Sequence, residues 1–420
     1  MSLASSFYSA LSGMDAHAIA MQIIGDNVAN VHTSGFKNST AHFEDILGQS
    51  LSAVTGTNTT GAGTKIATVD IDFFQGSFET TNVPTDVAIN GRGLFVLNDP
   101  TSDEQFYTRA GHFTMDNQGY YENAHGLRVQ GYLYDDLGQN LIETLSDIQI
   151  ELNDMIPPVA TAEAEMILNL DDEANILVWD PNDPYETCNF SSAMNIYDTV
   201  GSSHQIQVFF TKTANRTWSW HAMIDGSDVQ GGTPGVLQQY GTGTINFDVN
   251  GELTTGMPVA FYTGALTFLN GLTPGATTMD FTGSSQYGST SAVQSIFQDG
   301  YASGIVSNVA IDADGNLVAT YTNGEVKNIA RLALADFTNL NGLERKGSTL
   351  YQETPISGVP LLNKPGAGGM GTISGSMLEE SNVDIAAEFV NMIIIQRGYQ
   401  ANSKVISTTD EMMAQLMNIR

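Results

Sequence analysis

The residues that most resemble a chemical site are Asp312, Asp314 and Asn316, which occupy the first three ligand positions of a calcium-binding loop. Such a loop also requires a glycine at its sixth position, for a sharp turn, and a bidentate glutamate at its twelfth. This chain has Leu317 and Asn323 at those two positions. We therefore expect a hairpin turn here and no bound calcium ion.

Other patterns that could support catalysis or cofactor binding are incomplete. Gly366, Gly368 and Gly371 have the spacing of a dinucleotide-binding fingerprint, but no predicted strand precedes them and no predicted helix opens after them. The seven histidines show no metal-ligand spacing on a helix, and Cys188 lacks the neighbours typical of a catalytic cysteine. The residues therefore indicate no enzyme, no cofactor and no metal.

The charge of the chain argues against several classes of partner. Its 46 acidic residues outnumber its 15 basic ones, and the formal net charge of −31 repels nucleic acid and anionic lipid. No apolar run approaches the roughly 18 residues of a membrane helix, so no membrane insertion is expected. The first basic residue is Lys37, so no cleaved signal peptide is expected either.

Both ends of the chain carry an apolar stripe with steps of three and four residues, which is the spacing of a coiled-coil seam. Such helices usually pack against each other and against copies of the same chain, so the stripes predict assembly. The predicted assembly interface consists of Phe7, Leu11, Met14, Met21, Val28, Ile385, Phe389, Met392, Ile395, Tyr399, Ile406, Met413 and Leu416.

The segments between the stripes alternate with a period of two and contain regularly spaced Asp/Asn-Gly turns, which predicts β domains. Residues 141–290 contain 18 acidic and two basic residues, and all three tryptophans of the chain lie in this block. We therefore predict a mixed, mainly β fold with paired terminal helices and one β domain inserted into another. The predicted parts are terminal helices (1–35 and 378–420), linkers (36–75 and 361–377), an inner, discontinuous β domain (76–155 and 291–360) and an inserted, outer, acidic β domain (156–290).

Several motifs occur in an order that resembles one protein family. Residues 27–37 read NVANVHTSGFK, and their candidate signature positions are Asn27, Asn30, Thr33, Gly35 and Phe36. Residues 91–96, 107–113 and 126–132 of the β region and residues 381–384, 396–402 and 418–420 near the end complete the pattern. Together these stretches resemble the bacterial flagellar rod and hook proteins. One departure is Gly398, where that family more often has alanine; a close helix contact would account for it.

The resemblance implies a function in assembly. The length and the inserted block favour a hook-type member, which implies a helical homopolymer forming a curved, flexible tube that transmits motor torque from rod to filament. Implied partners are copies of the chain, flagellar rod and hook-associated junction proteins, the hook cap and the export apparatus. The implied location is extracellular, in the flagellar hook, after export without a cleaved signal peptide.

Two other interpretations remain open at this point. A distal rod or hook-associated junction protein of the same family would share the motifs. An extracellular β-rich binding module would explain the middle block but not the two helical ends.

Overall fold

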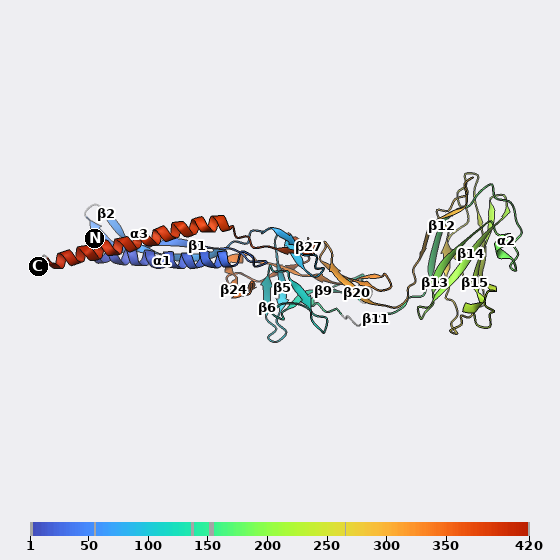
Figure 1. Ribbon diagram of the computed structural model, residues 1–420, viewed down its shortest axis with the longest axis horizontal. Helices are drawn as coiled ribbons and strands as arrows, with labels where there is room; N and C mark the ends of the chain where they lie inside the picture. Colours follow the sequence, from blue (N-terminus) through green and yellow to red (C-terminus); the bar gives the residue numbers. More distant parts are fainter. Residues whose placement is uncertain (1–2, 54–55, 136–137, 151–154, 265, 419–420) are drawn as a thin grey trace. The chain divides into compact units, whose positions relative to one another are not determined.

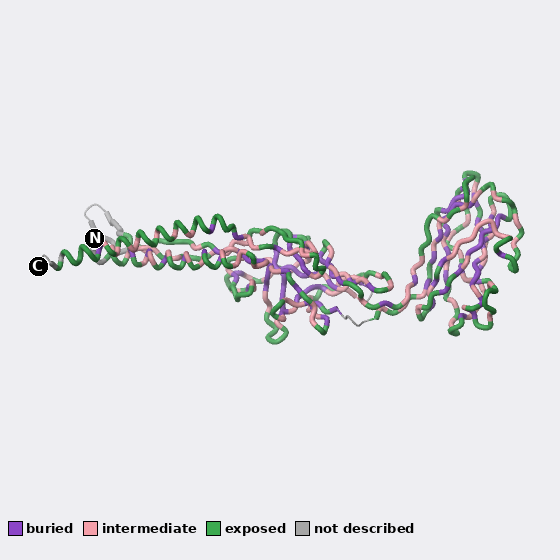
Figure 2. The backbone as a smooth tube through the Cα atoms, viewed as in Figure 1, coloured by how far each residue is buried: buried purple, intermediate pink, exposed green. Residues whose placement is uncertain are grey.

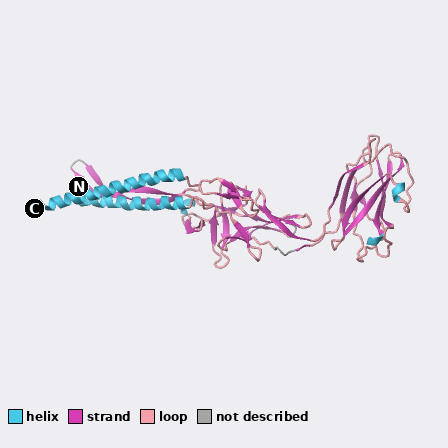
Figure 3. Cartoon of the chain, viewed as in Figure 1, coloured by secondary structure: helices cyan, strands magenta, loops and turns pink. Residues whose placement is uncertain are grey.

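The computed structural model describes residues 3–53, 56–135, 138–150, 155–264 and 266–418, and side-chain surroundings are not described for 3–4, 48–53, 56–60, 416 and 418. The chain divides into two compact units, each described by itself below. The first comprises Met1–Leu152, Asn308–Ala319 and Val326–Arg420, and the second comprises Asn153–Ser307 and Thr320–Glu325. The predicted fold class is confirmed in its coarse form, because the chain is mainly β with an α-helix at each end (Figure 3).

The two long helices of the first unit are α1 (Leu3–Ala29) and α3 (Ile385–Asn418). The start of α3 is capped by Asp384, whose Oδ1 accepts hydrogen bonds from the backbone N–H groups of Ala386 (2.8 Å) and Ala387 (3.2 Å). An aspartate here satisfies orphan backbone donors and suits the positive end of the helix. Asp384 therefore serves as the N-cap of α3.

Residues 36–75, predicted as a linker, contain a long antiparallel hairpin of β1 (Ser39–Ala53) and β2 (Gly56–Ile71). Its register runs from Ser39 opposite Ile71 to Ala53 opposite Gly56, and both strands lie along α1 (Figure 1). These residues therefore form paired strands where a linker was predicted. Threonine is β-branched and favours strands when a partner strand is available, and the sequence pattern alone does not reveal that partner.

The inner β domain of the first unit is built around one antiparallel sheet with the order β22-β9-β5-β6-β25-β24. Its core includes Leu94, Val96, Tyr107, Phe337 and Tyr351, all nearly inaccessible to solvent. Figure 2 shows buried segments, in purple, within this region of the chain. The strands of this region are β3 (Phe78–Thr80), β4 (Val87–Asn90), β5 (Leu94–Asn98), β6 (Gln105–Thr108), β7 (Phe113–Met115), β8 (Tyr121–Asn123), β9 (Arg128–Tyr134), β10 (Leu141–Asp147), β22 (Val326–Leu332), β23 (Leu334–Asp336), β24 (Glu344–Gly347) and β25 (Leu350–Gln352).

The second predicted linker, residues 361–377, also contains residues of three paired strands. β26 (Leu361–Asn363) pairs with β23, β27 (Thr372–Gly375) with β4, and β28 (Met377–Glu379) with β3. The glycines of the apparent dinucleotide fingerprint all lie in the loop between β26 and β27, and Gly366 and Gly368 have positive φ angles of 73° and 61°. The segment was misread because its glycines serve tight turns between short strands.

The second unit contains two four-stranded sheets, ordered β13-β14-β15-β16 and β17-β18-β12-β19. Side chains from both sheets share one core, which includes Met166, Phe210, Trp218, Trp220 and Met279. The elements are β11 (Met155–Ile156), β12 (Glu163–Asn169), α2 (Pro184–Thr187), β13 (Phe190–Tyr197), β14 (Ser203–Ala214), β15 (Thr217–Asp225), β16 (Leu237–Asn246), β17 (Val259–Ala260), β18 (Thr278–Asp280) and β19 (Ala292–Gln298). β20 (Gly304–Ile311) and β21 (Asn316–Tyr321) each contain residues of both units.

The boundary predicted at residue 290 differs from the observed arrangement. β19 pairs antiparallel with β12, from Ala164 opposite Gln298 to Asn169 opposite Ala292. The Ser/Gly/Thr-rich stretch before it is packed inside the second unit, where Ser285 N–H donates to the Leu168 carbonyl at 2.9 Å. The composition of this stretch suggested a domain boundary, whereas the stretch is a loop held within the second unit by hydrogen bonds.

The predicted Asp-Gly turns are present. In the loop that imitates a calcium site, the Asp312 Oδ1 accepts hydrogen bonds from the backbone N–H groups of Asp314 (2.9 Å) and Asn316 (2.8 Å), and Gly315 has a φ of +78°. Asp116 and Asp248 organise their turns in the same way. Within the described residues, no cluster of three or more His, Cys, Asp or Glu side chains is arranged to hold a metal ion.

Candidate assembly surface

The two terminal helices pack side by side and run antiparallel. A Cβ atom on Gly13 would lie 2.7 Å from the Asn402 Nδ2, and one on Gly398 would lie 2.7 Å from the His17 Nε2. Moving forward along α1 from 13 to 17 therefore moves backward along α3 from 402 to 398 (Figure 1). The close helix contact suggested for Gly398 is confirmed, because His17 occupies the space that a methyl group would need.

The buried stripe of α1 does not coincide with the predicted one. Ala10, Ala16, Ala20, Ile24 and Asn27 are each less than 9% exposed and face α3 or the hairpin. The large residues of the predicted stripe lie about one position later. Phe7 and Leu11 are 37% and 39% exposed, and Met14, Met21 and Val28 are half-buried. A stripe drawn through the largest side chains misplaces this seam, because close helix packing here selects alanine and glycine.

The predicted residues of α3 divide into two groups. Met392, Ile395 and Ile406 are half-buried, whereas four predicted residues remain exposed in the free chain. The exposed four are Ile385 (41%), Phe389 (50%), Tyr399 (36%) and Met413 (46%). Leu416 lies outside the residues whose side chains the structure describes.

An extended set of large apolar side chains is therefore exposed on the terminal elements. Many large apolar side chains exposed on the same elements usually mark an interaction site. The members beyond the predicted residues include Tyr8, Ile19, Phe43, Leu47, Val69, Val390, Ile393, Ile394, Val405, Met412 and Met417.

The candidate signature residues hold the end of α1 onto β1. The Asn27 side chain is 1% exposed; its Nδ2 donates to the Ser39 carbonyl (2.8 Å), and its Oδ1 accepts from the Ser39 N–H (2.9 Å). The Thr33 hydroxyl donates to the Asn30 Oδ1 at 3.1 Å. Asn27 therefore joins α1 to β1 through one donated and one accepted hydrogen bond. Its side-chain amide takes the place of the backbone partners that the strand lacks at its first residue.

Gly35 and Phe36 pack the segment after α1 against the inner β domain. Gly35 has a φ of +70°, and a Cβ atom there would lie 2.4 Å from the backbone nitrogen of Ala110. Its N–H donates to the Glu379 carbonyl at 2.7 Å. Phe36 is buried, with the Arg345 guanidinium carbon 5.2 Å from the ring centroid. Only glycine combines this backbone angle with so close an approach.

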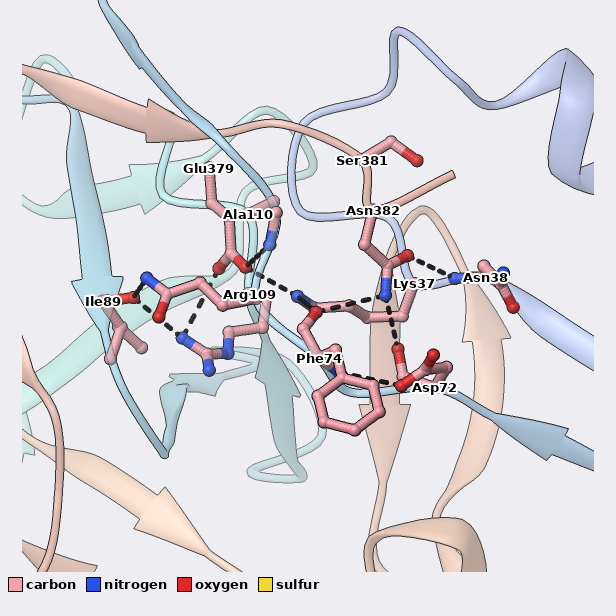
Figure 4. A network of polar contacts seen from close by, with 12 residues as sticks. Lys37, Asn38, Asp72, Phe74, Ile89, Arg109, Ala110, Glu379, Ser381 and Asn382 are labelled. Carbon is pink, nitrogen blue, oxygen red and sulfur yellow. Dashed lines mark hydrogen bonds and ion pairs between the residues drawn. The ribbon is translucent and has the colours of Figure 1, made fainter. Parts of the chain in front are cut away.

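A buried ion pair lies at the same junction, between segments from both ends of the chain. The Lys37 Nζ is 2.6 Å from the Glu379 Oε1, with both side chains fully buried, and it also donates to the Phe74 carbonyl at 2.8 Å (Figure 4). Arg109 Nη1 lies 3.4 Å from the other carboxylate oxygen of Glu379. Burial lowers the pKa of Lys37, and the Glu379 carboxylate opposes that shift.

Asn382 completes the junction network from the segment before α3. Its Oδ1 accepts from the Asn38 N–H at 2.8 Å, and its Nδ2 donates to the carbonyls of Asp72 (2.8 Å) and Phe74 (3.1 Å) (Figure 4). Lys37, Arg109 and Asn382 all stand in the motifs quoted above, but sequence reasoning gave them no role. Glu379 was missed entirely, since nothing local distinguishes it from the other acidic residues.

Two helical ends with exposed apolar side chains, anchored to a β framework by a buried polar network and without a metal cluster among the described residues, are typical of a structural protein. Comparison with known proteins agrees with this class. Four family models match, described as Flagella basal body rod protein (7–37), Flagellar hook protein FlgE/F/G D1 domain (88–162), Flagellar basal body protein FlaE D2 domain (168–301) and Flagellar basal body rod FlgEFG protein C-terminal (374–419).

Whole-length relatives specify the family further. The chain is 32% identical to the flagellar hook protein FlgE of Treponema pallidum, with 99% of both chains covered. It is also 32% identical to the FlgE of Escherichia coli, with 99% of this chain and all of that one covered. The crystal structure of the Helicobacter pylori flagellar hook protein FlgE2 shares its fold, with a TM-score of 0.51, 17% identity, 72% of this chain covered and all of that one.

The chain belongs to the flagellar hook protein family. It is a structural protein of the hook and not an enzyme, because that is the character of the family. The predicted hook-type resemblance is thereby confirmed. No helix among the described residues has the length and apolar character to cross a membrane.

Proposed function

We propose that this chain polymerises through its terminal helices into the flagellar hook, a curved and flexible tube that transmits motor torque from rod to filament. In this proposal each subunit leaves the cell through the flagellar export apparatus without a cleaved signal peptide. The growing tube meets the rod and the hook-associated junction proteins at its ends, with the hook cap at its tip during growth.

The observation that carries the proposal is the exposed apolar surface of α1 and α3. Phe389, Ile393 and Ile394 are at least half exposed in the free chain, although a soluble monomer gains nothing from such exposure. A second copy would bury them in a coiled-coil-like contact. When such contacts are head-to-tail and do not close a ring, they generate a helical filament.

The junction network supports the torque-transmitting part of the proposal. The terminal helix pair is tied to the inner β domain by the Lys37–Glu379 ion pair and by hydrogen bonds from Asn27 and Asn382. The buried hydrogen bonds and ion pairs of this network favour one arrangement of the elements that they join. A stiff junction of this kind would pass a twist from the helices to the β domain of the same subunit.

Electron microscopy of the purified protein under assembly conditions tests the proposal, with hollow curved tubes as the expected result. Leu11→Asp and Met392→Asp place a carboxylate where the polymer would bury it, at a cost of several kcal/mol per subunit. We expect both variants to remain folded by circular dichroism and to form no tubes. Thr233→Asp, on an exposed loop of the second unit, is the control and should form normal tubes.

Straight rods from the wild-type protein would favour a rod function. Particles that stay monodisperse at all concentrations, or normal tubes from both helix variants, would contradict assembly through the terminal helices.

A further inference from the structure

A groove between α1, β1 and α3 contains one buried carboxylate in otherwise mostly apolar surroundings. Its volume is about 210 Å³, and its lining includes Ile24, Phe43, Ile394 and Ile395 together with Glu388. Phe43 and Ile394 are 41% and 60% exposed, so the apolar wall is open to an incoming group. The groove therefore offers a binding surface for a side chain with an apolar stem and a positive end.

Glu388 is incompletely paired within its own chain. The residue is 6% exposed, and its Oε2 is buried without a hydrogen-bond partner. Its polar neighbour is the Asn27 side-chain amide, which is uncharged and also bonds to Ser39, and its charged neighbour is Asp384, which has the same sign. Burial raises the pKa of Glu388, as expected for a carboxyl group that lacks a cation. Buried carboxylates are normally paired.

The chain cannot supply that cation to its own Glu388 from α3. Arg397 and Lys404 follow nine and 16 residues later, about 13 and 24 Å along the helix axis at 1.5 Å per residue. A turn of 100° per residue places both on the opposite face of α3. Both are exposed, and neither forms an ion pair within the described part of the chain, whereas Lys65 on the hairpin is paired with Glu44 at 2.8 Å.

We propose that Arg397 of a second copy of the chain enters this groove and pairs with Glu388. Ile393 lies four residues before Arg397 on the same face of α3 and is 50% exposed, so one helix face presents an apolar and a cationic group together. These two groups match Phe43 and Glu388 across the contact. Lys404 is the weaker candidate, because its neighbour four residues earlier is the polar Gln400.

The placement of donor and acceptor on opposite faces of one helix has a structural consequence. Each copy gives its Arg397 to one neighbour and receives an arginine from another at Glu388, so the contact is head-to-tail and can propagate. The guanidinium can form two parallel hydrogen bonds to a carboxylate, which fixes the register of successive copies. This inference rests on the proposed polymerisation and assigns it a pair of specificity-determining residues.

Charge reversal tests the pair directly, with polymerisation followed by sedimentation and electron microscopy. Glu388→Arg and Arg397→Glu should each reduce the polymerised fraction more than about tenfold, because each places like charges in the contact. The double variant carrying both changes should polymerise to within about threefold of wild type, since the pair is restored with its signs exchanged. Lys404→Glu is the control, because it changes another exposed cation of α3, and its polymerised fraction should remain close to that of the wild type.

Mixing gives a test that does not depend on the folding of the double variant. In an alternating polymer of Glu388→Arg and Arg397→Glu chains, arginine meets arginine nowhere and every contact joins opposite charges. The two variants should therefore copolymerise when mixed and fail separately. Single variants that polymerise normally would overturn the pairing, as would a mixture and a double variant that both fail while the wild type forms tubes. A wild type without tubes would overturn the proposed function and the pairing together.

Discussion

The terminal helix pair and the inserted β unit use apolar residues in opposite ways. The second unit encloses its largest side chains, and Phe210, Trp218 and Trp220 have no measurable exposure. The helix pair buries mainly small residues and leaves Phe389 half exposed. The first arrangement closes a core within one chain, whereas the second leaves apolar area exposed in the free chain. The stability of each region should therefore respond differently to the same kind of substitution.

The largest expected effects come from removing a phenylalanine in each region. Phe210→Ala should lower the unfolding free energy of the second unit by about 3–5 kcal/mol, because it leaves a cavity in a closed core. Phe389→Ala should change the stability of the free chain by less than about 0.5 kcal/mol and should slow polymerisation strongly. Tryptophan fluorescence during urea unfolding reports the second unit alone, since all three tryptophans lie there. If both changes lowered the stability of the free chain equally, the helix pair and the second unit would not differ in how they use apolar residues.

Glu379→Gln tests whether the helix pair depends on the junction network. The change leaves the Lys37 ammonium group buried without its counter-charge, so we expect a loss of roughly 3–5 kcal/mol in the first unit. Calorimetry should show a lowered transition for that unit and an unchanged one for the second. The double variant Lys37→Met/Glu379→Leu should recover most of the loss, because neither charge is then buried. An unchanged transition of the first unit in Glu379→Gln would show that the junction network does not stabilise that unit.

Acid should weaken the second unit through His221, which stacks on Trp179 with ring centroids 4.2 Å apart. Burial lowers the pKa of His221 from 6.5 to about 4. The unfolded chain then binds a proton that the folded unit excludes. The stability from this group is therefore complete above pH 6.5 and falls by up to about 3 kcal/mol as the pH drops to 4. Urea unfolding of wild type and His221→Gln across this range should show the slope only in the wild type.

The helix pair should show the opposite sign at Glu388 in the free chain. Burial raises the pKa of this carboxyl group, and the nearby Asp384 adds to the shift, although the Asn27 amide opposes it. The folded state then holds a proton that the unfolded chain has released, so the contribution to stability increases as the pH falls through the folded pKa. Glu388→Gln should remove this gain when the thermal unfolding of the helices is followed by circular dichroism.

The smallest expected effect concerns Gly398. Alanine there would gain up to about 1 kcal/mol of helix propensity, but the His17 ring must move to admit the new methyl group. We expect Gly398→Ala to change stability by less than about 1 kcal/mol alone, and to stabilise the helix pair in a His17→Ala background. A double-mutant cycle on the thermal unfolding of the helices measures this difference. Additive effects would show that the close approach of His17 and Gly398 does not change the stability of the helix pair.

Local patterns predicted the parts of the fold that neighbouring residues decide. The hairpin turn at Asp312 and the helical nature of both ends follow from side chains within a few positions of one another. Patterns failed where the partner of a segment lies far away in sequence. The hairpin of β1 and β2 and the short strands β26, β27 and β28 appeared as linkers, because their pairing cannot be inferred from their composition.

The sequence by itself determined that the ends are helical, that the middle is β and that the motifs belong to the flagellar rod and hook proteins. Only the tertiary structure decided that Ala16 and Ala20 face inward while Leu11 remains exposed, and that Lys37 pairs with Glu379, 342 residues away. The physical reason is that helix and turn formation depend on short-range geometry, whereas burial depends on which surfaces meet. Small residues fit between the helices, and several of the large ones remain exposed in the free chain.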